Sequence, residues 1–240
     1  MPSVVVSTSS SCLNLLNVKH DIRILPLHIA INGVDFVDGK NITPSKLAEI
    51  MDSSSSSIAM TTPATELEVM AFFLDLYAQG YNEVFVCCLS SQFSQSYEIL
   101  CTVKQQLADK MLIFIYDTKT LNLHEGALAY EADYLLKQGK NFAEVAIQLD
   151  FLRQNSVFYF TLYDLDYIIR SKRLGASSGF FANLFDIKPI MEINQMGQIV
   201  AKQKIRKMDK VLSQLGKDIL QFTKDDDAFI YLFIIRRLSG

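Results

Sequence analysis

Apolar residues along this chain follow two patterns: short continuous runs typical of buried strands, and longer segments with a helical period. The clearest run is EVFVCCL at residues 83–89, which predicts a strand buried on both faces of a parallel sheet. The hydroxyl-rich segment SSQFSQSY at residues 90–97 follows it directly, and helical spacing resumes at Tyr97, Leu100 and Val103. This loop therefore lies where open α/β sheets bind ligands. The alternative is that its serines only cap the following helix.

The same reading predicts alternating strands and helices along the first two thirds of the chain. Strands are expected at residues 4–7, 22–31, 83–89, 111–116 and 157–161. Helices are expected at residues 65–79, 95–107, 121–138 and 142–154, the first opened by a capping box of Thr65 and Glu68. Such alternation predicts right-handed crossovers and a three-layer α/β domain, with helices on both faces of a parallel sheet.

The pattern changes after about residue 163. Residues 187–193 and 199–204 read as a β-hairpin around Asn194 and Gly197, followed by a helix at 206–222 and a last strand at 229–235. We therefore expect an N-terminal α/β domain at residues 1–163 and a smaller α/β domain at 164–240. A ligand cleft is expected at their boundary. The serine run at 53–57 reads as a mobile surface loop.

Composition narrows the class of protein. The chain has 240 residues, 50% hydrophobic and 20% charged, which suffices for a substantial core. Its net charge of -3 and its lack of a dense basic stripe argue against nucleic-acid binding. The densest basic cluster is interpreted as a solvated helix face; it comprises Lys202, Lys204, Arg206, Lys207 and Lys210.

Cysteine usage and hydropathy indicate a cytoplasmic protein. Cys12, Cys87, Cys88 and Cys101 have no metal-ligand spacing and are expected to be buried thiols in a reducing compartment. No apolar run approaches the roughly 18 to 20 residues needed to span a bilayer. The first residues lack both a basic region and a long apolar core, so we expect neither a signal peptide nor an integral membrane segment.

Signatures of catalysis are missing from the sequence. It has no phosphate-binding glycine loop, dinucleotide fingerprint, nucleophile elbow or zinc helix. His20, His28 and His124 are interpreted as surface or satisfied core histidines, and the aspartates at 225–227 as a solvated turn. We therefore predict no catalytic residue, no metal site and no cofactor.

Eight short motifs in a fixed order resemble those of the DegV family of bacterial fatty-acid-binding proteins. They are VVSTS (5–9), LPL (25–27), TTPAT (61–65), SSQFSQSY (90–97), YDT (116–118), DL-Y (164–167), SKRL (171–174) and IKPI (187–190). Each motif is short, but their order and spacing extend from the first expected strand to the last. The resemblance implies a two-domain DegV-like fold that encloses one long-chain fatty acid.

The resemblance also implies a role and a site. Such proteins present the carboxylate of the fatty acid to a fatty acid kinase, which phosphorylates it for phospholipid synthesis. The residues that hold the carboxylate fall on Thr61 and Ser94, with Thr62 and the backbone amide of Gln95 close by. The arginine on the kinase-facing side of the site falls on Arg173.

The chain departs from the family pattern at several of these positions. Thr8 replaces an aspartate of the first strand, and Ser94-Gln95-Ser96 replaces Ser-Gly-Thr. Residues 171–172, Ser-Lys, replace two glycines before Arg173, while Asn122 and His124 replace small residues. The second domain is also expected to be shortened, without the family's C-terminal segment and its histidine.

Two functions remain open from the sequence. One is a non-catalytic carrier of a long-chain fatty acid, whose carboxylate is presented to a fatty acid kinase. The other is a diverged family member that binds another small molecule, or a small-molecule enzyme.

Overall fold

The structure, a computed structural model, describes residues 2–16, 18–53, 58–162, 165, 168–169, 173 and 187–223. It divides into two compact units, Met1–Ser156 and Val157–Gly240. The domain boundary expected after residue 163 stays a prediction. Predictions for residues 225–227 and 229–235 lie outside the described residues.

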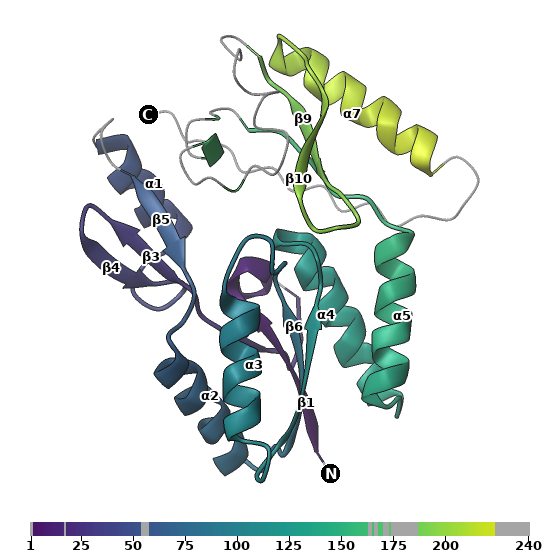
Figure 1. Cartoon of the computed structure of the whole chain (residues 1–240). Helices are drawn as coiled ribbons and strands as arrows, with labels where there is room; N and C mark the ends of the chain where they lie inside the picture. Colours follow the sequence, from purple (N-terminus) through teal and green to yellow (C-terminus); the bar gives the residue numbers. More distant parts are fainter. Residues whose placement is uncertain are drawn as a thin grey trace. The chain divides into compact units, whose positions relative to one another are not determined.

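The first unit contains the predicted parallel sheet. Its four strands are β1 (Ser3–Thr8), β2 (Arg23–Leu25), β6 (Glu83–Cys88) and β7 (Leu112–Asp117), in the spatial order β2-β1-β6-β7. All pairs are parallel, with Ser7 opposite Cys87 and Cys88 opposite Asp117. The carboxyl ends of β1, β6 and β7 therefore meet at one edge of the sheet (Figure 1).

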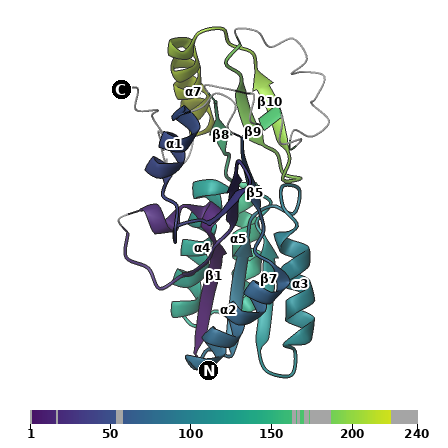
Figure 2. The same ribbon diagram turned by 90° about the vertical axis from the view of Figure 1, so that its left-hand side faces the viewer.

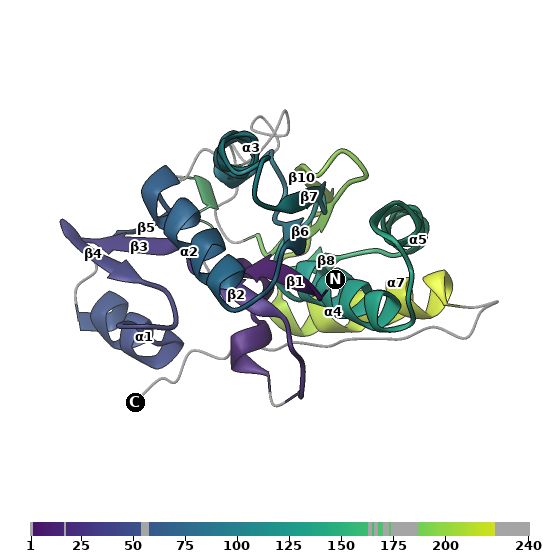
Figure 3. The ribbon, with the colours of Figure 1, turned by 90° about the horizontal axis from the view of Figure 1, so that it is seen from below.

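Helices cover both faces of this sheet, which confirms the predicted three-layer arrangement (Figure 3). Helices α2 (Glu66–Ala78) and α3 (Ser96–Gln106) pack against Val4 and Val6, whereas α4 (Asn122–Lys137) and α5 (Phe142–Gln154) pack against Val5. This division follows from the period of two along β1, which turns alternate side chains to opposite faces. The predicted capping box of Thr65 and Glu68 opens α2.

The prediction of a single strand at residues 22–31 is wrong. The segment is divided into β2 and β3 (His28–Ile31), which belong to different sheets, with Pro26 and Leu27 between them. Proline has no N–H to donate within a sheet. The Leu27 N–H donates instead to the Ser9 hydroxyl at 3.0 Å, which holds this connection against the end of β1.

Strand β3 is the centre of a small antiparallel sheet that the hydrophobic pattern did not predict. Its order is β4-β3-β5, with β4 at Val34–Val37 and β5 at Ala59–Thr62, and α1 (Pro44–Ser53) packs on one face. Asn32 and Gly33 form the β3–β4 turn with φ angles of 52° and 83°. An Asn-Gly pair is a strong hairpin signal and would have identified this turn. Ser53 ends α1, and the remaining serines at 54–57 lie outside the described residues.

The second unit confirms the predicted hairpin and the helix after it. Strands β8 (Tyr159–Phe160), β9 (Ile190–Ile193) and β10 (Ile199–Gln203) form an antiparallel sheet in the order β10-β9-β8. The Asn194 side chain accepts from the backbone of Met196 and Gln198 in the hairpin turn. Helix α7 (Met208–Phe222) runs beside this sheet (Figure 2).

No helix among the described residues is long and apolar enough to cross a lipid bilayer.

Candidate functional site

Buried hydroxyl groups gather at the carboxyl edge of the parallel sheet. They come from the ends of β1, β6 and β7 and from the turns that follow; the fully or almost fully buried ones belong to Ser7, Thr8, Ser9, Ser11, Ser90, Thr118 and Thr120. The sequence predicted such a loop after β6, and the structure adds the hydroxyls of its two neighbouring strands. This edge is where open α/β sheets bind ligands.

The loop of residues 90–96 follows β6 and is held by its own backbone and by the turn after β7. The Ser90 N–H donates to the Thr120 carbonyl at 2.7 Å, and the Phe93 N–H donates to the Ser90 carbonyl at 2.9 Å. The Phe93 side chain is buried. The Ser91 hydroxyl donates to the Asp117 carboxylate at 2.7 Å. These hydrogen bonds hold the backbone that leads from β6 to Ser94.

Ser94 lies two residues before α3 and bonds to the first residue of that helix. Its Oγ accepts from the Ser96 N–H at 3.1 Å and lies 2.8 Å from the Ser96 Oγ. The N-cap of α3 is Gln95, whose side chain makes no capping hydrogen bond, so Ser94 is not the N-cap expected in the alternative, although its Oγ accepts from the first N–H of the helix. Ser94 is half-buried and Gln95 is exposed, so both are accessible at the carboxyl edge.

Thr61 and Thr62 lie on β5, in the small sheet, and both are exposed. Thr61 pairs with Ile29, and Thr62 pairs with His28. Because adjacent strand residues point to opposite faces, Thr61 shares the face of Ile29, which packs with α1 residues, while Thr62 shares the face of His28. These two threonines, which the sequence grouped together, are therefore on opposite faces of the strand.

His28 connects the small sheet to helix α2. Its Nδ1 lies 2.6 Å from the Asp35 carboxylate on β4, and its Nε2 lies 3.0 Å from the Glu68 carboxylate on α2. Burial lowers the pKa of His28, but the hydrogen bonds and charges of Asp35 and Glu68 outweigh burial and raise it above its ordinary value of 6.5. This histidine, expected to be a surface or core residue, bridges two carboxylates.

Glu125 is a buried acid that the sequence reading missed. It lies in the first turn of α4, and its Oε1 accepts from the Ser7 hydroxyl at 3.0 Å and from the Thr8 hydroxyl at 2.7 Å. Its Oε2 is buried without a hydrogen-bond partner at bonding distance, although the Ser10 hydroxyl lies close enough to lower the pKa of the carboxyl. Burial outweighs these hydrogen bonds and raises the pKa of Glu125 to about 7. The signal in the sequence is an acid at a core position of the helix, three residues before Leu128.

His124 is a satisfied core histidine, as predicted. Its Nδ1 lies 3.0 Å from the Thr120 hydroxyl, and its Nε2 lies 2.7 Å from the Ser156 hydroxyl. Burial, and then the charge of Arg153, lower the pKa of His124 to about 4, so the ring is neutral at physiological pH. His20 is half-buried, and its Nε2 lies 3.4 Å from the Leu13 carbonyl.

Arg173 belongs to the second unit and is half-buried. Burial lowers the pKa of its guanidinium. Its neighbours at 171, 172 and 174 lie outside the described residues. Of the five predicted site residues, Thr61, Thr62, Ser94 and Gln95 belong to the first unit and Arg173 to the second.

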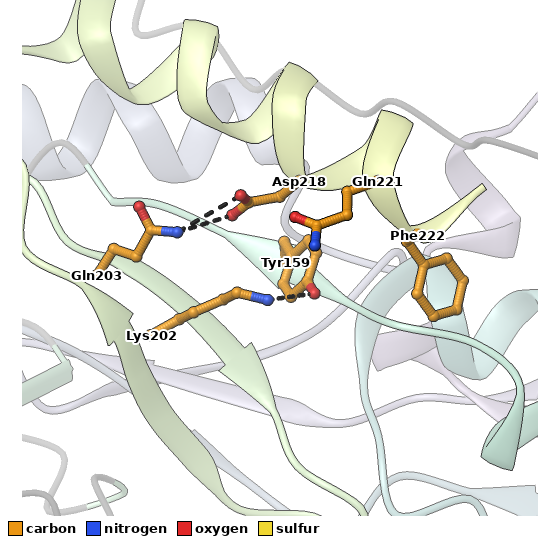
Figure 4. A pocket seen from close by; sticks show the side chains of 6 residues that line it. All are labelled: Tyr159, Lys202, Gln203, Asp218, Gln221 and Phe222. Carbon is orange, nitrogen blue, oxygen red and sulfur yellow. Dashed lines mark hydrogen bonds between the residues drawn. The ribbon is translucent and has the colours of Figure 1, made fainter. Parts of the chain in front are cut away.

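The second unit has a shallow pocket of about 330 Å³ between α7 and the sheet, lined by Tyr159, Lys202, Gln203, Asp218, Gln221 and Phe222 (Figure 4). Its polar groups pair with one another: Lys202 contacts the Tyr159 hydroxyl, and the Gln203 amide donates to Asp218 at 3.1 Å. Lys202 lies on β10, and its ammonium group lies over the ring of Tyr159. This position corrects its assignment to a solvated helix face.

The four cysteines are free thiols. Cys87 and Cys88 are buried as predicted, whereas Cys12 and Cys101 are partly exposed, which corrects the expectation for that pair. Burial, followed by the charges of Glu125 and Asp38, raises the pKa of Cys12 to about 11. Among the residues that the structure describes, no three His, Cys, Asp or Glu side chains are grouped so that they could hold a metal ion.

Comparison with known proteins identifies the family. A family model described as an uncharacterised protein of the DegV family matches residues 3–239. A DegV domain-containing protein of Clostridium acetobutylicum is 30% identical over 201 residues, which cover 81% of this chain and 70% of that protein. The crystal structure of DegV from Bacillus subtilis, described as a fatty acid binding protein, has a TM-score of 0.83 at 22% identity, covering 93% of this chain and 79% of that one. A stearic acid-binding protein from Eubacterium ventriosum has a TM-score of 0.81 at 23% identity, covering 93% and 78%. On this match across almost its whole length, the chain belongs to the DegV family.

Proposed function

We propose that this protein binds one long-chain fatty acid and holds its carboxylate with the hydroxyls of Thr61 and Ser94. The backbone N–H of Gln95 is a further donor, and Thr62 lies next to the site in sequence. Membership of the DegV family supports this proposal, as do structural neighbours described as fatty acid binding. The observation that carries it is the Ser90–Ser96 loop, in which the half-buried Ser94 follows the carboxyl end of β6.

The acyl chain supplies most of the affinity. Burying about 14 methylenes at about 0.8 kcal/mol each contributes on the order of 11 kcal/mol before the costs of ordering and association. A hydrogen bond from a hydroxyl to a carboxylate contributes about 1.5 to 3 kcal/mol, less the desolvation of the carboxylate. The hydroxyls therefore fix which end of the ligand faces outward. The ligand cleft expected between the two predicted domains stays a prediction.

The carboxylate is then presented to a fatty acid kinase, and the protein itself performs no chemistry. Arg173 is the residue that we assign to the kinase-facing side. A planar guanidinium suits an acyl phosphate better than an ammonium does, because its fork of donors matches two phosphate oxygens.

Extraction of the purified protein with organic solvent, followed by mass spectrometry, tests the proposal. We expect a saturated or monounsaturated fatty acid of about 14 to 18 carbons, the range whose methylenes provide the affinity estimated above. Native mass spectra should show the same mass bound at one molecule per chain. A different small molecule in the extract would favour a diverged ligand. The absence of any acyl ligand, together with no uptake of added palmitate, would refute the proposal.

A further inference from the structure

The Asp117 carboxylate connects the end of β7 to the loop that carries Ser94. Its Oδ2 accepts from the Ser91 hydroxyl at 2.7 Å, and its Oδ1 accepts from the Ser91 N–H at 3.3 Å. The same Oδ1 accepts from the Lys119 N–H at 2.9 Å. One half-buried carboxylate therefore holds both the loop after β6 and the turn after β7.

These bonds differ in kind from the others in the loop. The Ser90, Gln92 and Phe93 N–H groups donate to neutral oxygens. Among the described hydrogen bonds of residues 90–96, those from Ser91 to Asp117 are the ones with a charged acceptor. Hydrogen bonds to a charged group are shorter and stronger than neutral ones. Asp117 also fixes the turn in which Lys119 adopts a φ of 51°, a conformation that side chains rarely take.

The negative charge of Asp117 indicates how it acts. A carboxylate cannot bind another carboxylate directly, because like charges repel each other and neither group has a proton to donate. Asp117 instead accepts from both the N–H and the hydroxyl of Ser91. Ser94 lies three residues further along the same loop.

We infer that Asp117 is a positioning residue for the head-group site: through Ser91 it fixes the loop so that the Ser94 hydroxyl and the Gln95 N–H are directed at a bound carboxylate. This inference rests on the proposed function. It adds a residue and a mechanism to that function, because Asp117 acts without touching the ligand.

The test combines palmitate titration by calorimetry, on protein stripped of lipid, with hydrogen exchange of the loop amides. We expect Asp117→Ala and Ser91→Ala each to weaken palmitate binding about tenfold, the size of one lost hydrogen bond at the head group. Asp117→Asn keeps one acceptor oxygen for the Ser91 and Lys119 N–H groups but loses the charge and the second carboxylate oxygen, so its palmitate affinity should lie between those of the wild type and Asp117→Ala. The amides of residues 91–96 should exchange fastest in Asp117→Ala and at an intermediate rate in Asp117→Asn.

A double-mutant cycle separates positioning from general destabilisation. In a Ser94→Ala background, Asp117→Ala should weaken binding by less than about threefold, since residues that act as one unit are not additive. Asp150→Ala is the matched control, because the Asp150 carboxylate on α5 accepts from the hydroxyl of Tyr116, the residue before Asp117 on β7. It should leave palmitate affinity and loop exchange unchanged.

The outcomes distinguish the inference from the proposed function. If the wild type binds palmitate and Asp117→Ala binds it equally well, the positioning role is wrong. Fully additive effects of Asp117→Ala and Ser94→Ala, or an Asp117→Asn variant as weak as Asp117→Ala, would also overturn it. If the wild type binds no palmitate, the proposed function fails. Unchanged loop exchange in Asp117→Ala would then overturn the positioning role independently, and faster exchange would support it.

Discussion

The Thr8 hydroxyl at the end of β1 donates a 2.7 Å hydrogen bond to the Glu125 carboxylate on α4, and both side chains are fully buried. The resemblance to the family places an aspartate at position 8, whereas here the acid comes from the helix packed against that strand. The cradle of Ser7 and Thr8 hydroxyls therefore surrounds a carboxylate supplied by a different element.

The first prediction concerns this buried acid. Because the pKa of Glu125 rises from 4.5 to about 7 on folding, its contribution to stability is full below pH 4.5 and is lost as the pH rises through 7. Glu125→Gln mimics the protonated acid and removes this loss. Relative to the wild type, the variant should gain on the order of 2–3 kcal/mol of unfolding free energy between about pH 5 and pH 8.

Urea unfolding followed by circular dichroism at a series of pH values measures this difference. Glu144→Gln on the exposed end of α5 is a control for the loss of an acid near a helix start. A stability difference between Glu125→Gln and the wild type that does not change with pH would contradict the prediction.

The second prediction concerns Gly126, the next residue on α4. A Cβ at this position would lie 2.6 Å from the Ser11 carbonyl oxygen, which is backbone and cannot move aside cheaply. Gly126→Ala should therefore destabilise the protein by about 1 to 3 kcal/mol, despite the better helix propensity of alanine. In α7, a Cβ at Gly216 would meet nothing within 4 Å, so Gly216→Ala should stabilise by about 0.5 to 1 kcal/mol. Equal shifts of the thermal midpoint for the two variants would disprove the close approach.

The third prediction concerns the bridge made by His28. Because its pKa is raised above 6.5 on folding, its contribution is full below that pH and is lost as the pH rises through the folded pKa. The partners Asp35 and Glu68 are 58% and 45% exposed, so solvent screens the interaction and the effect is small. Thermal melts at acidic and alkaline pH should show that His28→Gln costs more stability in acid. A larger cost in alkaline solution would contradict the raised pKa.

Some of this fold and site could be predicted from local sequence, and some could not. The buried strand β6, the capping box of Thr65 and Glu68 and the hairpin at Asn194 depend on residues a few positions apart, and all were found. The small sheet was missed because the run at 22–31 looks continuous until Pro26 is given weight as a boundary. The Asn32–Gly33 turn was the remaining local clue.

The supports of the site were not predictable in this way. Thr8 and Glu125 are 117 residues apart, and Ser91 and Asp117 are 26 residues apart. Their contacts follow from strand order and register, which bring the ends of β1, β6 and β7 together. A period of two or 3.6 residues carries no information about such pairs. Thr61 and Thr62 show the converse, because period-two geometry alone separates them once they are known to lie in a strand.

The fourth prediction uses that separation. Thr61→Val should weaken palmitate binding about tenfold, because valine keeps the shape of the side chain and removes its hydroxyl donor. Thr62→Val is the matched control on the opposite face of β5 and should bind within about twofold of the wild type, as expected for a substitution that removes no ligand contact. Ser94→Ala should weaken binding as Thr61→Val does. If Thr62→Val alone weakens binding, the ligand carboxylate lies on the His28 face.

The last prediction concerns Arg173 and the kinase. We expect Arg173→Ala to leave palmitate affinity nearly unchanged and to reduce acyl phosphate formation by a reconstituted fatty acid kinase, because the guanidinium would act on the developing phosphoryl charge or on docking. Arg173→Lys should recover only part of the rate, since an ammonium keeps the charge and loses the planar fork. Lys210→Ala, a basic residue on α7, controls for the loss of a positive charge from the second unit. Equal acyl phosphate formation in the wild type and Arg173→Ala would show that the assignment of Arg173 to the kinase-facing side is wrong. A wild type that binds palmitate but supports no phosphorylation would show that this chain is a carrier that does not use the kinase tested.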